Sequence, residues 1–98
     1  MSRSLVERRL SEVSTRLRTL RDELAVSDEQ LAFLAEAADD ARLRSLVSET
    51  PIADREHHEA QRHADAMSRH RAELLESITR LEATQDELLD RLTAEPQP

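Results

Sequence analysis

The residues best suited to chemistry lie between positions 50 and 67, in the stretch TPIADREHHEAQRHADAM. This stretch holds three of the four histidines of the chain, together with four carboxylates. Side chains three or four residues apart share one face of a helix, and the pairs Asp54 with His58 and Glu59 with His63 have this spacing. The first question is therefore whether these residues form a metal or catalytic site.

Neither kind of site is supported by the surrounding sequence. The HEAQR segment at 58–62 would match the zinc-protease pattern HExxH if its last residue were histidine, but Arg62 is permanently charged and cannot bind zinc. Further ligands would have to come from a facing helix, where only Asp39 and Asp40 are suitably placed. The chain has no cysteine, and no serine follows a strand-to-helix elbow. We therefore expect no enzymatic activity and no cofactor, and a metal-binding helical module remains an alternative that would rest on His57, His58, Glu59 and His63.

The composition predicts helices rather than a compact globule. The chain of 98 residues has one Phe, no Trp, no Tyr and no Gly, and 36% of its residues are charged. Aromatic side chains supply much of the buried area of an ordinary core, whereas the Ala, Leu, Glu and Arg that predominate here favour helices. No apolar run has the length of a signal peptide or of a membrane span of ~18 residues. We expect a cytoplasmic, all-α protein.

Apolar residues repeat in both halves of the chain at alternating steps of four and three, which is the heptad pattern of a coiled coil. Three polar residues, Ser27, Arg71 and Gln85, occupy positions in this pattern. The seam of the first half consists of Val6, Leu10, Val13, Leu17, Leu20, Leu24, Leu31, Leu34, Ala38 and Ala41, and that of the second half of Ala60, Ala64, Met67, Leu74, Ile78, Leu81, Leu88 and Leu92.

Pro51 separates the two heptad segments. It has no amide hydrogen and disfavours the helical conformation of the preceding residue, so we expect Thr50 to cap a second helix with Pro51 in its first turn. A connection this short makes the helices antiparallel neighbours. The sequence predicts an antiparallel coiled-coil hairpin with a first helix at about 3–47, a turn at 48–50, a second helix at about 51–94 and a tail at 95–98.

The polar interruptions in the seams favour one register of this hairpin. Facing residues have numbers with a constant sum, and alternate layers match when the sum is 98 or 105. A sum of 98 places Ser27 opposite Arg71, whereas 105 places Ser27 opposite Ile78 and leaves a polar group against an apolar one. We therefore expect a fold-back centred on Glu49, with the layers Leu10 with Leu88, Leu17 with Leu81, Leu20 with Ile78, Leu24 with Leu74, and Leu31 with Met67.

Additional apolar residues widen this seam. Leu5, Val26 and Phe33 share one heptad position beside the first seam, and Leu75 with Leu89 share one beside the second. They either flank the seam of the hairpin or form a second face that joins two hairpins into a four-helix dimer. We expect Val26 and Phe33 to contribute to partner binding or to self-association.

The charge of the chain is uneven. Residues 1–21 carry six Arg against two Glu, while residues 22–66 carry twelve acids against four Arg. Most of the surface would repel duplex nucleic acid, and no aromatic residues alternate with the arginines to stack on bases. Nucleic acid is therefore an unlikely partner.

The segment TPIADREHHEAQ, followed by RHADAMSRHRAELLESITRLEA, resembles the tip and second helix of the DksA-type transcription factors, and more loosely the coiled-coil arm of the Gre factors. The resemblance implies an arm that enters the secondary channel of RNA polymerase with an acidic tip. Asp54, in Ala53-Asp54-Arg55, matches a tip acid of the DksA pattern. The chain departs from that pattern at 50–52, where a first tip Asp is absent, and at Glu56, which replaces Ala.

The sequence thus favours a non-enzymatic protein-interaction module. Three acids at the predicted tip, Glu49, Asp54 and Glu56, are the candidate contacts for a partner, together with Val26 and Phe33 on the flank. The resemblance makes RNA polymerase the most concrete partner and transcription regulation the corresponding role. The alternative is a structural coiled coil, either a homo-oligomeric scaffold or a small partner subunit.

Overall fold

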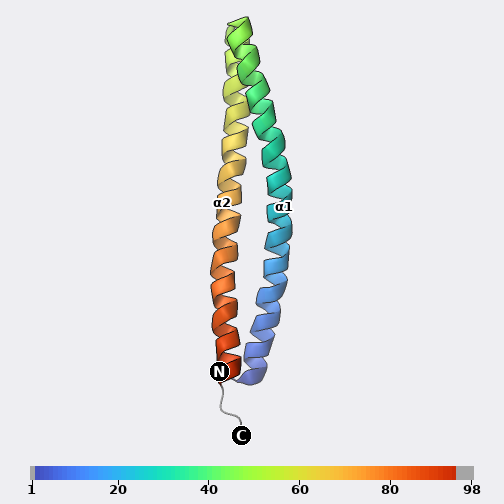
Figure 1. The fold of residues 1–98 in the computed structure, drawn as a ribbon, viewed down its shortest axis with the longest axis vertical. Helices are drawn as coiled ribbons and strands as arrows, with labels where there is room; N and C mark the ends of the chain where they lie inside the picture. Colours follow the sequence, from blue (N-terminus) through green and yellow to red (C-terminus); the bar gives the residue numbers. More distant parts are fainter. Residues whose placement is uncertain (1, 95–98) are drawn as a thin grey trace. The chain divides into compact units, whose positions relative to one another are not determined.

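A computed structural model describes residues 2–94, and all of them except Ser2, Glu49 and Thr50 are helical. Helix α1 spans Arg3–Ser48 and helix α2 spans Pro51–Ala94 (Figure 1). The predicted all-α class with two long helices is confirmed, with no strand in residues 2–94. α1 ends one residue later than the expected position near 47, and the predicted tail at 95–98 lies outside the described residues.

The chain divides into two compact units, each of which contains a segment of both helices. The terminal unit consists of Met1–Glu23 with Leu74–Pro98, and the turn unit of Leu24–Glu73. The two helices are antiparallel in each unit. In the terminal unit Ser14 contacts Gln85 while Arg21 contacts Glu82, and in the turn unit Asp28 contacts Arg71 while Ser45 contacts Asp54.

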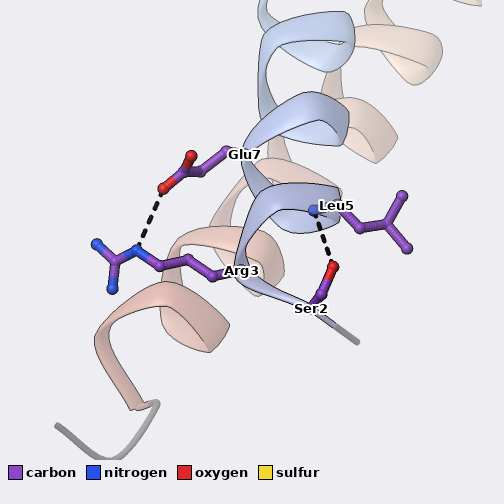
Figure 2. A network of polar contacts seen from close by, with 4 residues as sticks. All are labelled: Ser2, Arg3, Leu5 and Glu7. Atoms are coloured by element: carbon purple, nitrogen blue, oxygen red, sulfur yellow. Dashed lines mark hydrogen bonds and ion pairs between the residues drawn. The ribbon is translucent and has the colours of Figure 1, made fainter. Parts of the chain in front are cut away.

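A serine caps the start of α1. The Ser2 hydroxyl accepts a hydrogen bond from the Leu5 amide at 3.2 Å, and Figure 2 shows this contact beside the ion pair of Arg3 with Glu7. The first amides of a helix have no intrahelical partner, so a cap of this kind contributes about 1 kcal/mol. The ion pair joins two exposed side chains one turn apart and contributes little.

The turn between the helices contains a residue in the left-handed conformation. Glu49 has φ of 51°, and its amide donates to the Ser45 carbonyl at 3.0 Å, which continues the α1 pattern by one residue. Thr50 then starts α2, because its hydroxyl accepts from the Ala53 amide at 3.2 Å and Pro51 occupies the first helical position. The predicted cap at Thr50 is confirmed.

Every residue of the predicted seams is buried or half-buried. In the terminal unit the buried side chains are large: Val6, Leu17, Leu20, Leu74, Ile78 and Leu88. In the turn unit the buried residues are small: Ser27, Ala38, Ala41, Ala53 and Ala64. The burial of Ala53 was not predicted, although Ala53, His57 and Ala60 continue the seam of α2 at steps of four and three.

Contacts between the helices support the predicted register. Three of the four contacts join residues whose numbers sum to 99, next to the predicted 98 and far from 105. The fourth contact, between Arg21 and Glu82 at 3.3 Å, has a sum of 103. It joins two long side chains, which can reach past the residue directly opposite. At the polar layer of the turn unit Ser27 is buried, and the guanidinium of Arg71 pairs with Asp28, the residue after Ser27.

Candidate functional site

The three predicted tip acids occupy different parts of the turn unit. Glu49 lies in the turn itself, Asp54 in the first turn of α2, and Glu56 half a turn further along that helix. All three residues are exposed. The structure therefore brings them to the same end of the turn unit, where carboxylates near the start of α2 are favoured by the positive end of the helix dipole.

Asp54 also has a structural contact that the sequence did not predict. Its Oδ1 accepts a hydrogen bond from the Ser45 hydroxyl at 2.8 Å, across the turn from α1 to α2. A hydrogen bond to a carboxylate is stronger than one between neutral groups. Asp54 therefore holds the last turn of α1 against the first turn of α2, in addition to being exposed.

The predicted flank residues are strongly exposed. Val26 is 52% and Phe33 is 71% exposed, on the side of α1 away from its seam. Neither side chain is used to hold the two helices of the turn unit together. A single exposed apolar side chain is common on a soluble protein, so the significance of Phe33 depends on the other large apolar side chains exposed in the same unit.

Four more large apolar side chains, none of them predicted as a partner contact, are exposed around the turn. They are Leu43, Leu46, Val47 and Ile52, with Val47 reaching 86% exposure. The signal was present in the sequence, because none of the four occupies a seam position although all lie within ten residues. Together with Val26 and Phe33, we call these side chains the apolar surface of the turn unit.

The turn unit also has an open hollow of about 360 Å³. Its apolar lining comes from Leu34, Ala37, Ala41 and Ala60, and its polar lining from Arg44, Glu56, Glu59 and His63. Small residues on both helices leave this space, because alanine side chains do not fill the volume that leucines would occupy at the same positions. Glu56, predicted as a tip contact, is therefore also part of this hollow.

The histidines do not form a metal site with their neighbours. The rings of His57 and His58 are stacked, with centroids 5.7 Å apart, and His63 lies beside the hollow instead. Within residues 2–94, no group of three or more His, Cys, Asp or Glu residues is placed to hold a metal ion. The metal-binding alternative thus has no ligand set in the described part of the chain.

No helix within the described residues combines the length and apolar character required to cross a membrane.

No protein-family model matches the chain, and no match was found among the curated proteins or the solved structures. The resemblance to the DksA-type and Gre-type arms rests on the residues of the turn and of α2 alone.

Proposed function

We propose that this protein is a cytoplasmic, non-enzymatic interaction module whose turn unit binds another protein. The observation that carries the proposal is the distribution of apolar side chains in this unit, where alanines are buried and large residues are exposed. Exposed large apolar side chains that gather in one region are costly in water and typically mark a protein-binding site, and four of the six here lie within residues 43–52. The residues of this surface are Val26, Phe33, Leu43, Leu46, Val47 and Ile52.

Carboxylates next to this surface indicate the character of the partner. Glu49, Asp54 and Glu56 are exposed at the same end of the unit, so a complementary surface would combine an apolar recess with basic residues. In its most concrete form, suggested by the resemblance at Asp54, the partner is RNA polymerase and the turn enters a basic channel of that enzyme. The role would then be regulation of transcription.

The test is affinity purification of the full chain from its host, with immunoblotting for RNA polymerase. A triple variant, Glu49→Gln, Asp54→Asn and Glu56→Gln, removes the three charges, and the Asn retains an oxygen that accepts from Ser45. We expect this variant to recover at least ~10-fold less polymerase, since each lost charge contact contributes on the order of 1 kcal/mol and every 1.4 kcal/mol is a factor of ten.

A matched control removes three exposed acids of the terminal unit, with the changes Glu12→Gln, Asp86→Asn and Glu87→Gln. Polymerase recovery should stay close to that of the unmodified chain. If the polymerase is absent from every eluate, or if both triple variants recover it equally well, the transcription role is wrong.

A homo-oligomeric scaffold is the second candidate function. Val26, Phe33 and Val47 share a heptad position on the exposed side of α1, as the residues of a second coiled-coil seam would. Sedimentation that gives a stable dimer or tetramer, with no partner protein recovered from the host, would favour the scaffold over the interaction module.

A further inference from the structure

The exposed side of α1 in the turn unit carries a second heptad stripe beside the hollow. Its positions follow the steps of four and three that also define the seam, so they form one face of the helix. Two of its members, Ala37 and Arg44, line the hollow. The stripe consists of Val26, Gln30, Phe33, Ala37, Asp40, Arg44 and Val47.

A matching face of α2 borders the other side of the hollow. Ile52, Glu56, Glu59 and His63 are spaced by four, three and four residues, so they share one face of α2, and the last three line the hollow. At the hollow, the stripe of α1 and this face of α2 therefore form the two walls of a groove. We call it the lateral groove of the turn unit.

The lateral groove has apolar walls and an excess of negative charge. Where the groove is hollowed, Ala37 and Ala60 supply apolar surface, and Glu56 and Glu59 are accompanied by one arginine, Arg44. By their spacing, Phe33, Asp40 and Ile52 extend the same two helix faces beyond the hollow. Among the described residues, the ion pairs join other groups and leave these three carboxylates exposed for a partner. The whole turn unit, residues 24–73, carries eleven acids against six Arg.

We propose that the lateral groove binds an amphipathic helix of a partner protein, with an apolar seam flanked by Arg or Lys. This inference rests on the proposed interaction function and specifies its partner chemistry. The hollow of about 360 Å³ is roughly twice the ~150 Å³ of an engineered apolar cavity that binds benzene, so one or two apolar side chains fit into it. The basic flanks of the partner helix pair with Glu56 and Glu59.

Charge complementarity favours a basic helix in the groove over a second copy of the chain and over nucleic acid. A second copy placed groove to groove would bring the carboxylates of both copies together, and nucleic acid would bring phosphates towards them. A basic helix instead gains attraction from each carboxylate and covers the apolar walls. The geometry is that of a third helix packed against two, for which the heptad steps of the α1 stripe are suited.

The experiment measures binding of fluorescent synthetic helices to the full chain by anisotropy. One peptide has about three heptads with Leu at the seam positions and Arg at the flanking positions, and the second replaces every Arg with Glu. We expect saturable binding of the Arg peptide alone. Changing Glu56→Gln together with Glu59→Gln should weaken it by at least ~10-fold, which corresponds to about 1.4 kcal/mol.

The matched control removes two charges from α1 outside the groove, by Glu36→Gln together with Asp39→Asn. It should change the affinity less than ~2-fold, as expected for charges remote from the contact.

A pair of tryptophan variants tests packing independently of charge. Ala37→Trp fills the hollow and should abolish binding, whereas Ser77→Trp, beside a second hollow in the terminal unit, should not. Circular dichroism verifies that both tryptophan variants keep their helices.

Equal weakening by both charge pairs would overturn the inference, because it would indicate general attraction to an acidic protein. Retention of binding by Ala37→Trp would also overturn it. A dimer of the free chain that Ala37→Trp dissociates would assign the groove to a second copy. If the groove variants still capture a protein partner from the host as well as the unmodified chain does, this inference fails while the proposed function stands. If the unmodified chain captures no protein partner, the proposed function fails.

Discussion

The terminal unit and the turn unit use the same pairing of two antiparallel helices but allocate their apolar side chains in opposite ways. The terminal unit buries Leu17, Leu20 and Leu88, and the most exposed large apolar residue in its described part is Leu89, at 46%. The turn unit buries alanines and exposes residues such as Phe33 and Val47. The large side chains of the terminal unit therefore stabilise the pairing of the helices, whereas the exposed ones of the turn unit are available for contacts with another molecule.

Local contacts at the turn help the turn unit to remain paired in spite of this. Burial contributes about 25 cal/mol for each Å² of apolar surface, so a buried alanine contributes much less than a buried leucine. The turn unit compensates with local contacts, which are the cap at Thr50 and the hydrogen bond from Ser45 to Asp54. We expect its stability to depend on close approach and on the turn, and that of the terminal unit to depend on buried volume.

The largest effect should come from Leu17→Ala in the terminal unit. Leu17 is 1% exposed, and removing a side chain buried to this degree costs about 3 kcal/mol, through lost burial and the cavity left behind. The measurement is the free energy of unfolding from urea denaturation followed by circular dichroism. Leu34→Ala, at a half-buried position of the turn unit, is the matched change and should cost clearly less. Equal losses would contradict the contrast between the two units.

The second effect is overpacking of the turn unit by Ala38→Leu. Ala38 is 4% exposed, so three additional carbon atoms have to push the helices apart, at a cost of about 1–3 kcal/mol. Ala35→Leu adds the same atoms at an exposed position of the same helix and should leave the unfolding free energy nearly unchanged. A stabilising Ala38→Leu would show that the alanine contacts are loosely packed.

A third test concerns the turn itself, where the expected changes are about 1 kcal/mol. Glu49 adopts the left-handed conformation, which glycine adopts without steric cost, so Glu49→Gly should stabilise the chain by up to about 1 kcal/mol. Thr50→Ala removes the cap of α2 and should destabilise it by about 1 kcal/mol. Thermal denaturation of both variants provides the comparison, and a lower melting temperature for Glu49→Gly would contradict the argument from backbone strain.

The smallest effects should come from two ion pairs between the helices, one from each unit as far as residues 2–94 show. Asp28 pairs with Arg71 in the turn unit and Glu82 with Arg21 in the terminal unit, and the two carboxylate side chains are 51% and 50% exposed. Solvent screens pairs of this kind, so Asp28→Asn and Glu82→Gln should each cost less than ~1 kcal/mol. Urea denaturation at low and high salt tests this. A large loss at either site would mean that charge pairing, rather than apolar packing, distinguishes the units.

Much of the fold was predictable because its determinants are local. Heptad spacing identifies the seam residues, Pro51 with Thr50 identifies the start of the second helix, and the polar residues Ser27 and Arg71 distinguish the two registers. The candidate site was only partly predictable. Val26 and Phe33 are displaced from the seam in the sequence itself, but the sequence left open whether they flank the seam or form a second, exposed face.

Features that depend on contacts across the turn were missed for a physical reason. The hydrogen bond from Ser45 to Asp54 joins residues nine apart in sequence, and no periodic pattern relates them. The burial of Ala53 and the exposure of Val47 are a different case, because both follow from the heptad spacing once it is continued to the end of each helix.

The sequence by itself determined the two helices, their seams and their antiparallel pairing, because helix propensity, heptad spacing and a proline act over short distances. The tertiary structure decided where small side chains leave space between the helices and where large apolar side chains are exposed to solvent. Alanines that meet across the turn unit leave a hollow between two walls, whereas large residues such as Phe33 and Val47 of the same unit lie outside the seam. Such a surface depends on residues of both helices at once, and for that reason it cannot be assigned from either helix alone.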